Sequence, residues 1–202
     1  MNPVRDNSGE HISNGVKVLG ILGSPRRGGN AERLLDKALQ GAGSCGASTE
    51  KLCLNELAIR PCQECGGCDD TGECVIADDM AMVYGKIDKA DRIILASPVF
   101  FGGLTAQTKA MIDRFQCRWV RKYRLKTAPE AGKKGAFLCV SARHKEEFFE
   151  NAVRIARIFF IVLDIAYAGD VWCKGVSDKG EIAKHPDSLE EAFKLGKALV
   201  SP

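Results

Sequence analysis

The chain has 202 residues, of which 45% are hydrophobic and 27% are charged, and it contains nine cysteines. A chain of this length forms one domain that buries roughly 70% of the surface exposed by the unfolded chain, so it does not need disulfides to hold a core. The formal net charge of +3 is too small to indicate a nucleic-acid partner.

The distribution of polar and apolar residues along the chain indicates where in the cell the protein is expected. Residues 1–15 are polar and rich in turn-forming residues, and we expect a flexible tail there. The longest apolar run, residues 158–169, contains Asp164 and falls short of the roughly 20 residues of a membrane span. We therefore expect a cytoplasmic protein without membrane contact, in which clustered cysteines serve as metal ligands or redox groups.

From residue 16 onward, apolar strands alternate with amphipathic helices. The predicted strands cover residues 16–22, 48–54, 91–101, 134–141 and 164–172. The predicted helices cover residues 30–43, 79–90, 105–116, 145–163 and 186–200. This alternation predicts a doubly wound α/β domain over residues 16–202, with a five-stranded parallel sheet of flavodoxin-like order 2-1-3-4-5 and helices on both faces.

Ligands of such a fold bind beyond the carboxyl ends of the strands, and the first loop at that edge is GSPRRGGN, residues 23–30. Backbone N–H groups at the start of the following helix favour a phosphate, and arginine forks add charged donors. The loop lacks the Gly-Lys-Ser/Thr of a P-loop, and a solvated glycine-rich turn is the alternative. The residues of the predicted monophosphate site are Ser24, Arg26, Arg27, Gly28, Gly29 and Asn30.

Two more loops are expected at the same edge. In the second, residues 97–107, Pro98 restricts the backbone, Phe100 and Phe101 supply apolar cover, and Gly102 with Gly103 permits close approach of a flat ligand. The third loop, residues 141–147, offers Ser141, Arg143 and His144 as hydrogen-bonding groups for the polar edge of a heterocycle. No catalytic residue is assigned, because a single histidine in a polar loop is weak evidence.

These loops resemble those of the NADPH-dependent FMN reductase branch of the flavodoxin-like proteins, over residues 16–199. GSPRRGGN is similar to that family's FMN-phosphate loop, and SPVFFGGLTAQTKAMIDR to its isoalloxazine-side loop and following helix. The resemblance implies that Ser24, Arg26, Gly28 and Asn30 hold the phosphate. It also implies that the ring system is bordered by Pro98, Val99, Phe100, Phe101 and Gly102. Ala31 and Phe100 depart from the family pattern, which more often has a hydroxyl residue and a tyrosine there.

The segment CQECGGCDDTGEC places Cys62, Cys65, Cys68 and Cys74 close together in the chain. It resembles the compact pattern of the iron–sulfur flavoproteins of this superfamily, in which four thiolates hold a [4Fe-4S] cluster. A Cys-x2-Cys-x2-Cys run can wrap three corners of such a cluster. Zinc, or no metal at all, remain alternatives. Because the segment follows the second strand, we expect cluster and flavin to be near neighbours, within one chain or across a dimer contact.

The leading hypothesis is an FMN-dependent oxidoreductase that passes electrons between a [4Fe-4S] cluster, FMN and a donor such as NAD(P)H or a ferredoxin-like protein. The alternative is an NAD(P)H-dependent FMN or quinone reductase without a cluster. A third hypothesis is a zinc-stabilised binding module that uses the basic stretch at residues 118–126. We expect this stretch to be a solvated loop, with attraction of an anionic cofactor, partner or nucleic acid as alternatives.

The helix expected over residues 145–163 is too apolar for one that keeps half its surface in water. We therefore expect it to bury a second face, against a partner subunit as well as the sheet. The family resemblance extends this expectation to a homodimer or homotetramer.

Overall fold

The computed structural model describes residues 15–127 and 132–201, so the tail expected over residues 1–15 lies, except for Gly15, outside the described residues. Five parallel strands form one sheet in the order β2-β1-β3-β4-β5. The strands are β1 (Lys17–Leu22), β2 (Ser48–Cys53), β3 (Arg92–Pro98), β4 (Lys134–Ser141) and β5 (Ala166–Lys174). The flavodoxin-like fold predicted from the alternation of strands and helices is confirmed.

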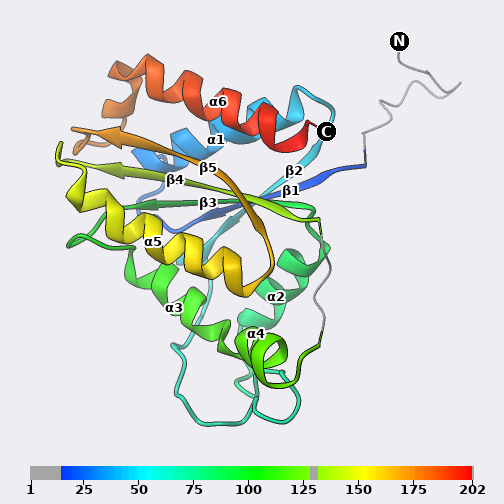
Figure 1. Ribbon diagram of the computed structural model, residues 1–202. Coiled ribbons are helices and arrows are strands. Elements are labelled where there is room, and N and C mark those ends of the chain that lie inside the picture. The colour runs from blue at the N-terminus through cyan, green and yellow to red at the C-terminus, as the bar shows by residue number, and fades with distance from the viewer. Residues whose placement is uncertain (1–14, 128–131, 202) are drawn as a thin grey trace, which may run out of the picture.

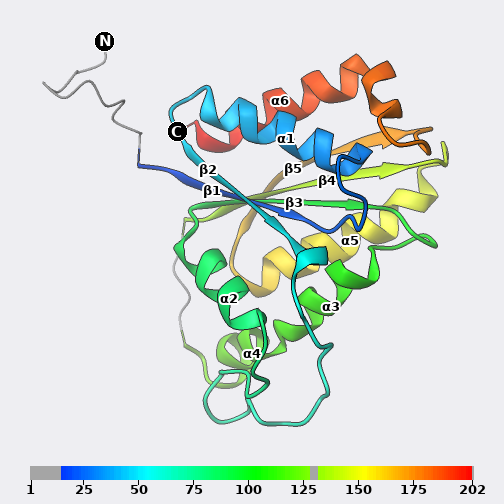
Figure 2. The same cartoon turned by 180° about the vertical axis from the view of Figure 1, so that it is seen from behind.

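Helices cover both faces of the sheet (Figures 1 and 2). On one face α1 (Asn30–Gly43) lies beside α6 (Pro186–Val200). The helices of the other face are α2 (Met80–Lys89), α3 (Ala106–Arg114), α4 (Gln116–Trp119) and α5 (Glu147–Val162). Among these described helices, none has the length and apolar character that crossing a membrane requires.

The central strand β3 supplies side chains to both apolar layers. Ile93 and Leu95 pack among the residues under α2, α3 and α5, whereas Ile94 and Ala96 pack under α1 and α6. All four side chains are fully buried. A strand covered on both faces needs apolar residues at every position, which is why this stretch reads as a continuous apolar run in the sequence.

Two strands end two or more residues away from the expected position. β3 ends at Pro98 and not at residue 101, because Phe100 and Gly103 pair with each other through two backbone hydrogen bonds of 2.9 Å and turn the chain back. β5 runs on to Lys174, two residues past the expected end. This extension brings the loop that follows β5 to the carboxyl edge of the sheet.

The basic stretch at residues 118–126 is not a solvated loop, and that expectation is wrong. Residues Val120–Arg124 form a π-helical turn, η2, that continues α4. Four of its cations pair with acidic side chains brought close by the fold. These pairs are Arg118 with Asp88, Arg121 with Glu73, Lys122 with Asp164 and Arg124 with Asp69.

Helices α1 and α6 approach each other backbone to backbone at two glycines. A Cβ atom added at Gly196 would lie 1.9 Å from the carbonyl oxygen of Ala38, and one added at Gly41 would lie 2.0 Å from that of Phe193. No side chain fits at either position. The α1–α6 layer therefore depends on these two glycines.

We expect Gly196→Ala to lower the free energy of unfolding by about 1–3 kcal/mol, because the added methyl forces the two helices apart. Gly85→Ala is the matched control: Gly85 is also within a helix, and an added Cβ there meets nothing within 4 Å. This control should gain about 0.5–1 kcal/mol from helix propensity. Urea unfolding followed by circular dichroism measures both, and equal stability of Gly196→Ala and the wild type would contradict the prediction.

Candidate functional site

A cavity of about 270 Å³ lies where the loops after β1, β3, β4 and β5 meet. Its size is close to the lower end of small-molecule sites, about 300 Å³. The lining residues are Ser24, Pro25, Arg26, Asn30, Ala31, Pro98, Val99, Phe100, Val140, Ser141, Ala142, Val176 and Ser177. The cavity thus combines a polar wall from the first loop with an apolar wall from the second.

The first loop is braced by hydrogen bonds at the cavity. The hydroxyl of Ser24 accepts the backbone N–H of Arg26 at 3.2 Å. The Arg26 guanidinium donates to the carbonyl oxygen of Ser177 at 2.9 Å, so its charge is held at the cavity by the loop after β5. The residue before α1 is Gly29, which has no side chain to cap the helix. The positive end of the helix dipole therefore lies beside Asn30 and Ala31 in the cavity wall.

Two further N–H groups of the predicted phosphate loop are also occupied, because Gly29 donates to the carbonyl oxygen of Arg26 at 3.2 Å and Gly28 donates to a side chain. The backbone N–H of Gly28 donates to Glu32 at 2.6 Å, and the other carboxylate oxygen of Glu32 accepts from Lys51 at 2.6 Å. Partial burial raises the pKa of Glu32, but the hydrogen bonds from Lys51 and Gly28 outweigh it and leave that pKa below its ordinary value. The N–H of Gly28 is therefore committed to the Glu32 carboxylate, and Gly28 does not line the cavity.

Asn30 ties the first loop to the chain after β5. Its amide nitrogen donates to the carbonyl oxygen of Asp178 at 2.9 Å. Its amide oxygen accepts the backbone N–H groups of Gly180 and Ile182 at 3.0 and 3.2 Å. Asn30 still lines the cavity, but only one of the two N–H groups of its side-chain amide is left for a ligand.

A network of buried hydroxyls joins the first loop to the second. Thr105 donates to the carbonyl oxygen of Gly23 at 2.6 Å and lies 2.8 Å from the hydroxyl of Thr108. A Cβ added at Gly23 would lie 1.8 Å from that Thr108 hydroxyl, so only glycine fits. Sequence reasoning missed both threonines, because a Thr at a helix start is common as a cap and Thr105 does cap α3.

The second and third loops place some predicted residues in the cavity and others outside it. Pro98, Val99, Phe100 and Ser141 line it. The predicted residues that do not line it are Arg27, Gly28, Gly29, Phe101, Gly102, Gly103 and Arg143. Phe101 is fully exposed, with a positive φ of 50°, at the tip of the turn that Phe100 and Gly103 close. Arg27 points elsewhere and pairs with Glu56 at 2.5 Å.

A fourth wall was missed by the sequence analysis. Val176 and Ser177 complete the cavity from the loop after β5. The signal that could have found them is the stretch VWCKGV, residues 171–176, whose apolar alternation extends the last strand beyond residue 172.

The cysteine segment does not lie beside this cavity. None of residues 62–74, all of them described, lines it, and Figure 1 shows the segment below α3 and α4, away from the carboxyl edge of the sheet. The expectation that the segment adjoins the flavin loops within one chain is therefore wrong. Cys62 lies instead in a groove of about 580 Å³ with Phe115, Trp119 and Ile158.

The four cysteines do not form a ligand cage in the described conformation. All four are free thiols. Within residues 15–127 and 132–201, no three histidine, cysteine, aspartate or glutamate side chains are grouped so that they could hold a metal ion. Burial and the neighbouring charge of Asp69 raise the pKa of the Cys68 thiol. Thiol side chains are suitable ligands for a soft metal, but in this conformation they are not close enough together to bind one.

Sequence comparison identifies relatives over most of the chain. A family model described as NADPH-dependent FMN reductase matches residues 16–171. An iron-sulfur flavoprotein of Methanosarcina thermophila is 43% identical over 99 residues, which are 49% of this chain and 52% of that protein. An iron-sulfur flavoprotein of Methanocaldococcus jannaschii is 31% identical over 155 residues, 76% of this chain and 75% of that protein. The aligned region with the Methanosarcina protein thus spans about half the length of that relative.

Solved structures share the fold. A flavone reductase superposes with a TM-score of 0.70 at 21% identity, over 91% of this chain and 62% of that one. An NAD(P)H:quinone oxidoreductase from Methanothermobacter marburgensis also has a TM-score of 0.70, at 17% identity, over 91% of this chain and 98% of that one. At these identities the likeness shows the fold alone.

We expect Asn30→Ala to lower the free energy of unfolding by about 2–3 kcal/mol, because the N–H groups of Gly180 and Ile182 lose their acceptor. Asn30→Asp keeps an acceptor for both groups and should recover part of the loss. Chemical unfolding monitored by tryptophan fluorescence measures the two variants. An Asn30→Ala protein as stable as the wild type would show that these bonds contribute nothing.

Proposed function

The chain belongs to the NADPH-dependent FMN reductase family. We propose that it is an FMN-dependent oxidoreductase and that its flavin binds in the cavity lined by the loops at residues 23–30, 98–100 and 140–142. The observation that carries the proposal is the pairing, in one cavity, of a helix N-terminus and an arginine with an apolar wall. The first two suit a phosphate and the third suits a ring system. Bound FMN would supply hydride and single-electron transfer.

The roles of this chain's residues follow from their places in the cavity wall. Arg26 and the start of α1 bind the phosphate monoester, and Ser24 orients the loop by accepting the N–H of Arg26. Pro98, Val99 and Phe100 cover one side of the rings and exclude water from it. Ser141 and the loop after β5 close the other side. Family membership supports a nicotinamide as the electron donor.

We propose in addition that the cysteine segment takes up a [4Fe-4S] cluster through Cys62, Cys65, Cys68 and Cys74. The four free thiols within thirteen residues support it, as does the similarity to proteins named iron-sulfur flavoproteins. The described conformation does not gather these thiols, so we derive no electron-transfer step through the cluster. The same family without a cluster, as an NAD(P)H-dependent FMN or quinone reductase, is the second candidate.

A homodimer or homotetramer is proposed from the outer face of α5. Ile158 and Ile161 on this helix are 54% and 57% exposed. Ile158 also borders the apolar groove that contains Cys62. Exposed apolar side chains beside an apolar groove favour burial against another surface.

We expect Arg26→Glu to weaken FMN binding by about 1.5–3 kcal/mol, or roughly 10- to 100-fold in Kd, because a carboxylate replaces a charged donor at the phosphate. Arg27→Glu is the matched control: it makes the same charge change on the neighbouring residue, which lies outside the cavity wall. Flavin fluorescence titration measures both. Equal losses in the two variants would point to a general charge effect, and no loss in Arg26→Glu would contradict the phosphate site.

We expect Cys65→Ser to prevent retention of the iron and to leave FMN affinity unchanged, because the segment and the cavity share no residue. Iron and sulfide are measured after anaerobic reconstitution, and wild-type protein should hold about four of each per chain. Cys53→Ser, outside the segment, is the control. Wild-type protein with bound FMN and no iron would favour the second candidate function.

A further inference from the structure

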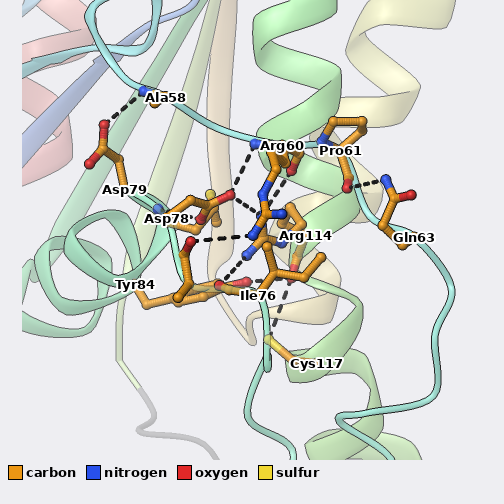
Figure 3. Close-up of polar contacts among 12 residues, drawn as sticks. Ala58, Arg60, Pro61, Gln63, Ile76, Asp78, Asp79, Tyr84, Arg114 and Cys117 are labelled. Carbon is orange, nitrogen blue, oxygen red and sulfur yellow. Dashed lines mark hydrogen bonds and ion pairs between the residues drawn. The ribbon is translucent and has the colours of Figure 1, made fainter.

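The two ends of the cysteine segment meet at one buried side chain. Arg114, at the end of α3, donates to the carbonyl oxygen of Arg60 at 2.8 Å, two residues before Cys62. The same guanidinium donates to the carbonyl oxygen of Ile76 at 3.1 Å, two residues after Cys74. Figure 3 shows Arg114 between the two chain segments that contain Arg60 and Ile76. One guanidinium therefore holds both flanks of the segment, which we call the first stem (residues 60–61) and the second stem (residues 75–78).

Asp78 completes this contact from the second stem. Its carboxylate lies 2.6 Å from Arg114, and the two side chains are 6% and 0% exposed. The same carboxylate accepts the backbone N–H group of Arg60 at 3.0 Å (Figure 3). It also accepts the backbone N–H group of Met80 at 3.0 Å. Burial raises the pKa of Asp78, but the contact with Arg114 and the backbone N–H donors outweigh it and lower that pKa. The first stem, the second stem and the start of α2 are thus joined.

The end of α3 that carries Arg114 is itself fixed. Its carbonyl oxygen accepts the hydroxyl of Tyr84 at 2.6 Å and the thiol of Cys117 at 3.5 Å. Removal of Arg114 leaves the buried carboxylate of Asp78 as an uncompensated charge, which destabilises a fold strongly. Because Arg114 has all its carbonyl and carboxylate partners on the two stems, loss of this residue acts first on the cysteine segment.

One donor of Arg114 is left over. Its Nε–H is buried and has no hydrogen-bond partner among the described residues. Burial lowers the pKa of Arg114, and the contacts with Asp78 and with the Cys74 side chain raise it by more, so the net direction is upward.

Two more arginines hold the outer part of the segment less tightly. Arg121 donates from Nε to the carbonyl oxygen of Gly72 at 3.1 Å and pairs with Glu73. Arg124 pairs with Asp69 at 2.7 Å, and its side chain is 51% exposed. Exposed pairs contribute little to stability, whereas removing one partner of a buried pair is costly, so loss of the contact at the base should affect the segment most.

We propose that Arg114 is a positioning residue that closes the base of the cysteine segment and so sets the places of its first and last cysteines. The hydrogen bonds from Arg114 to the two stems, which we call the tie, do not depend on a bound metal. Its consequence for cluster retention rests on the function proposed above. The hydrogen bonds of the Arg114 side chain go to Arg60, Ile76 and Asp78, and Arg114 does not line the cavity, so we expect its role to be separate from FMN binding.

The test is the rate at which N-ethylmaleimide alkylates Cys74 in the full chain before any iron is added, read by peptide mass spectrometry. We expect Arg114→Met to react about tenfold faster or more, because local opening of the segment becomes easier. Arg114→Lys keeps the charge next to Asp78 and should restore part of the protection. Arg124→Met removes the same charge from a half-exposed pair on the same segment and should react at the wild-type rate.

Two outcomes overturn the proposal. A wild-type rate in Arg114→Met shows that the tie does not control the segment. Equal rates in Arg114→Lys and Arg114→Met show a packing defect that a cation does not rescue. If Arg114→Met does not fold, Asp78→Asn, which removes the partner charge, is measured in its place. We expect Cys74 to be alkylated faster in this variant than in the wild type. A wild-type rate would again contradict the proposal.

A second measurement separates this inference from the proposed cluster. After anaerobic reconstitution with ferrous iron and sulfide, we expect Arg114→Met to lose iron faster than the wild type while FMN affinity is unchanged. A wild type that takes up no iron contradicts the cluster, and the alkylation rates then decide the tie alone. Iron retained equally by both proteins contradicts the consequence for cluster retention, and the alkylation rates again decide whether Arg114 closes the base of the segment.

Discussion

Parallel pairing of β1, β3, β4 and β5 is the constraint from which the candidate site follows. Because these strands run in the same direction, the loop after each one emerges at the same edge of the sheet. The buried hydroxyls of Thr105 and Thr108 then fix the first loop against the second. Asn30 fixes it against the loop after β5. A cavity lined from four separate parts of the chain is held in this way by a few short polar contacts.

Charge is organised locally although the chain as a whole is close to neutral. The net charge of +3 gives no sign that Arg114, Arg121 and Arg124 all contact one cysteine-bearing segment. Acidic residues of that segment pair with cations of the α3–η2 stretch, and the most buried pair lies at the base. The segment is thus anchored to the helical layer, whereas the cavity is built from the sheet edge.

The principal elements of the fold were predictable because their signals are local. Buried parallel strands read as apolar runs, as in residues 92–98, and helices such as α1 show one apolar face. The phosphate-type loop was found because a glycine-rich stretch lies between a strand and a helix. Arg26 and Asn30 do lie at the cavity, but Arg27 and Gly28 have other partners, Glu56 and Glu32. Those partners are distant along the chain or compete within the same turn, and no residue pattern reveals which contact is made.

The sequence by itself determined the strand order, the edge at which a ligand would bind, and the presence of four thiols within thirteen residues. Only the tertiary structure decided that the basic stretch 118–126 is helical and paired, that the cysteine segment lies away from the cavity, and that Arg114 joins its two ends. The physical reason is that periodicity and glycine placement act between neighbours in the chain. An ion pair such as Arg114 with Asp78 joins residues 36 positions apart, and its partners meet only when the layers around them have packed.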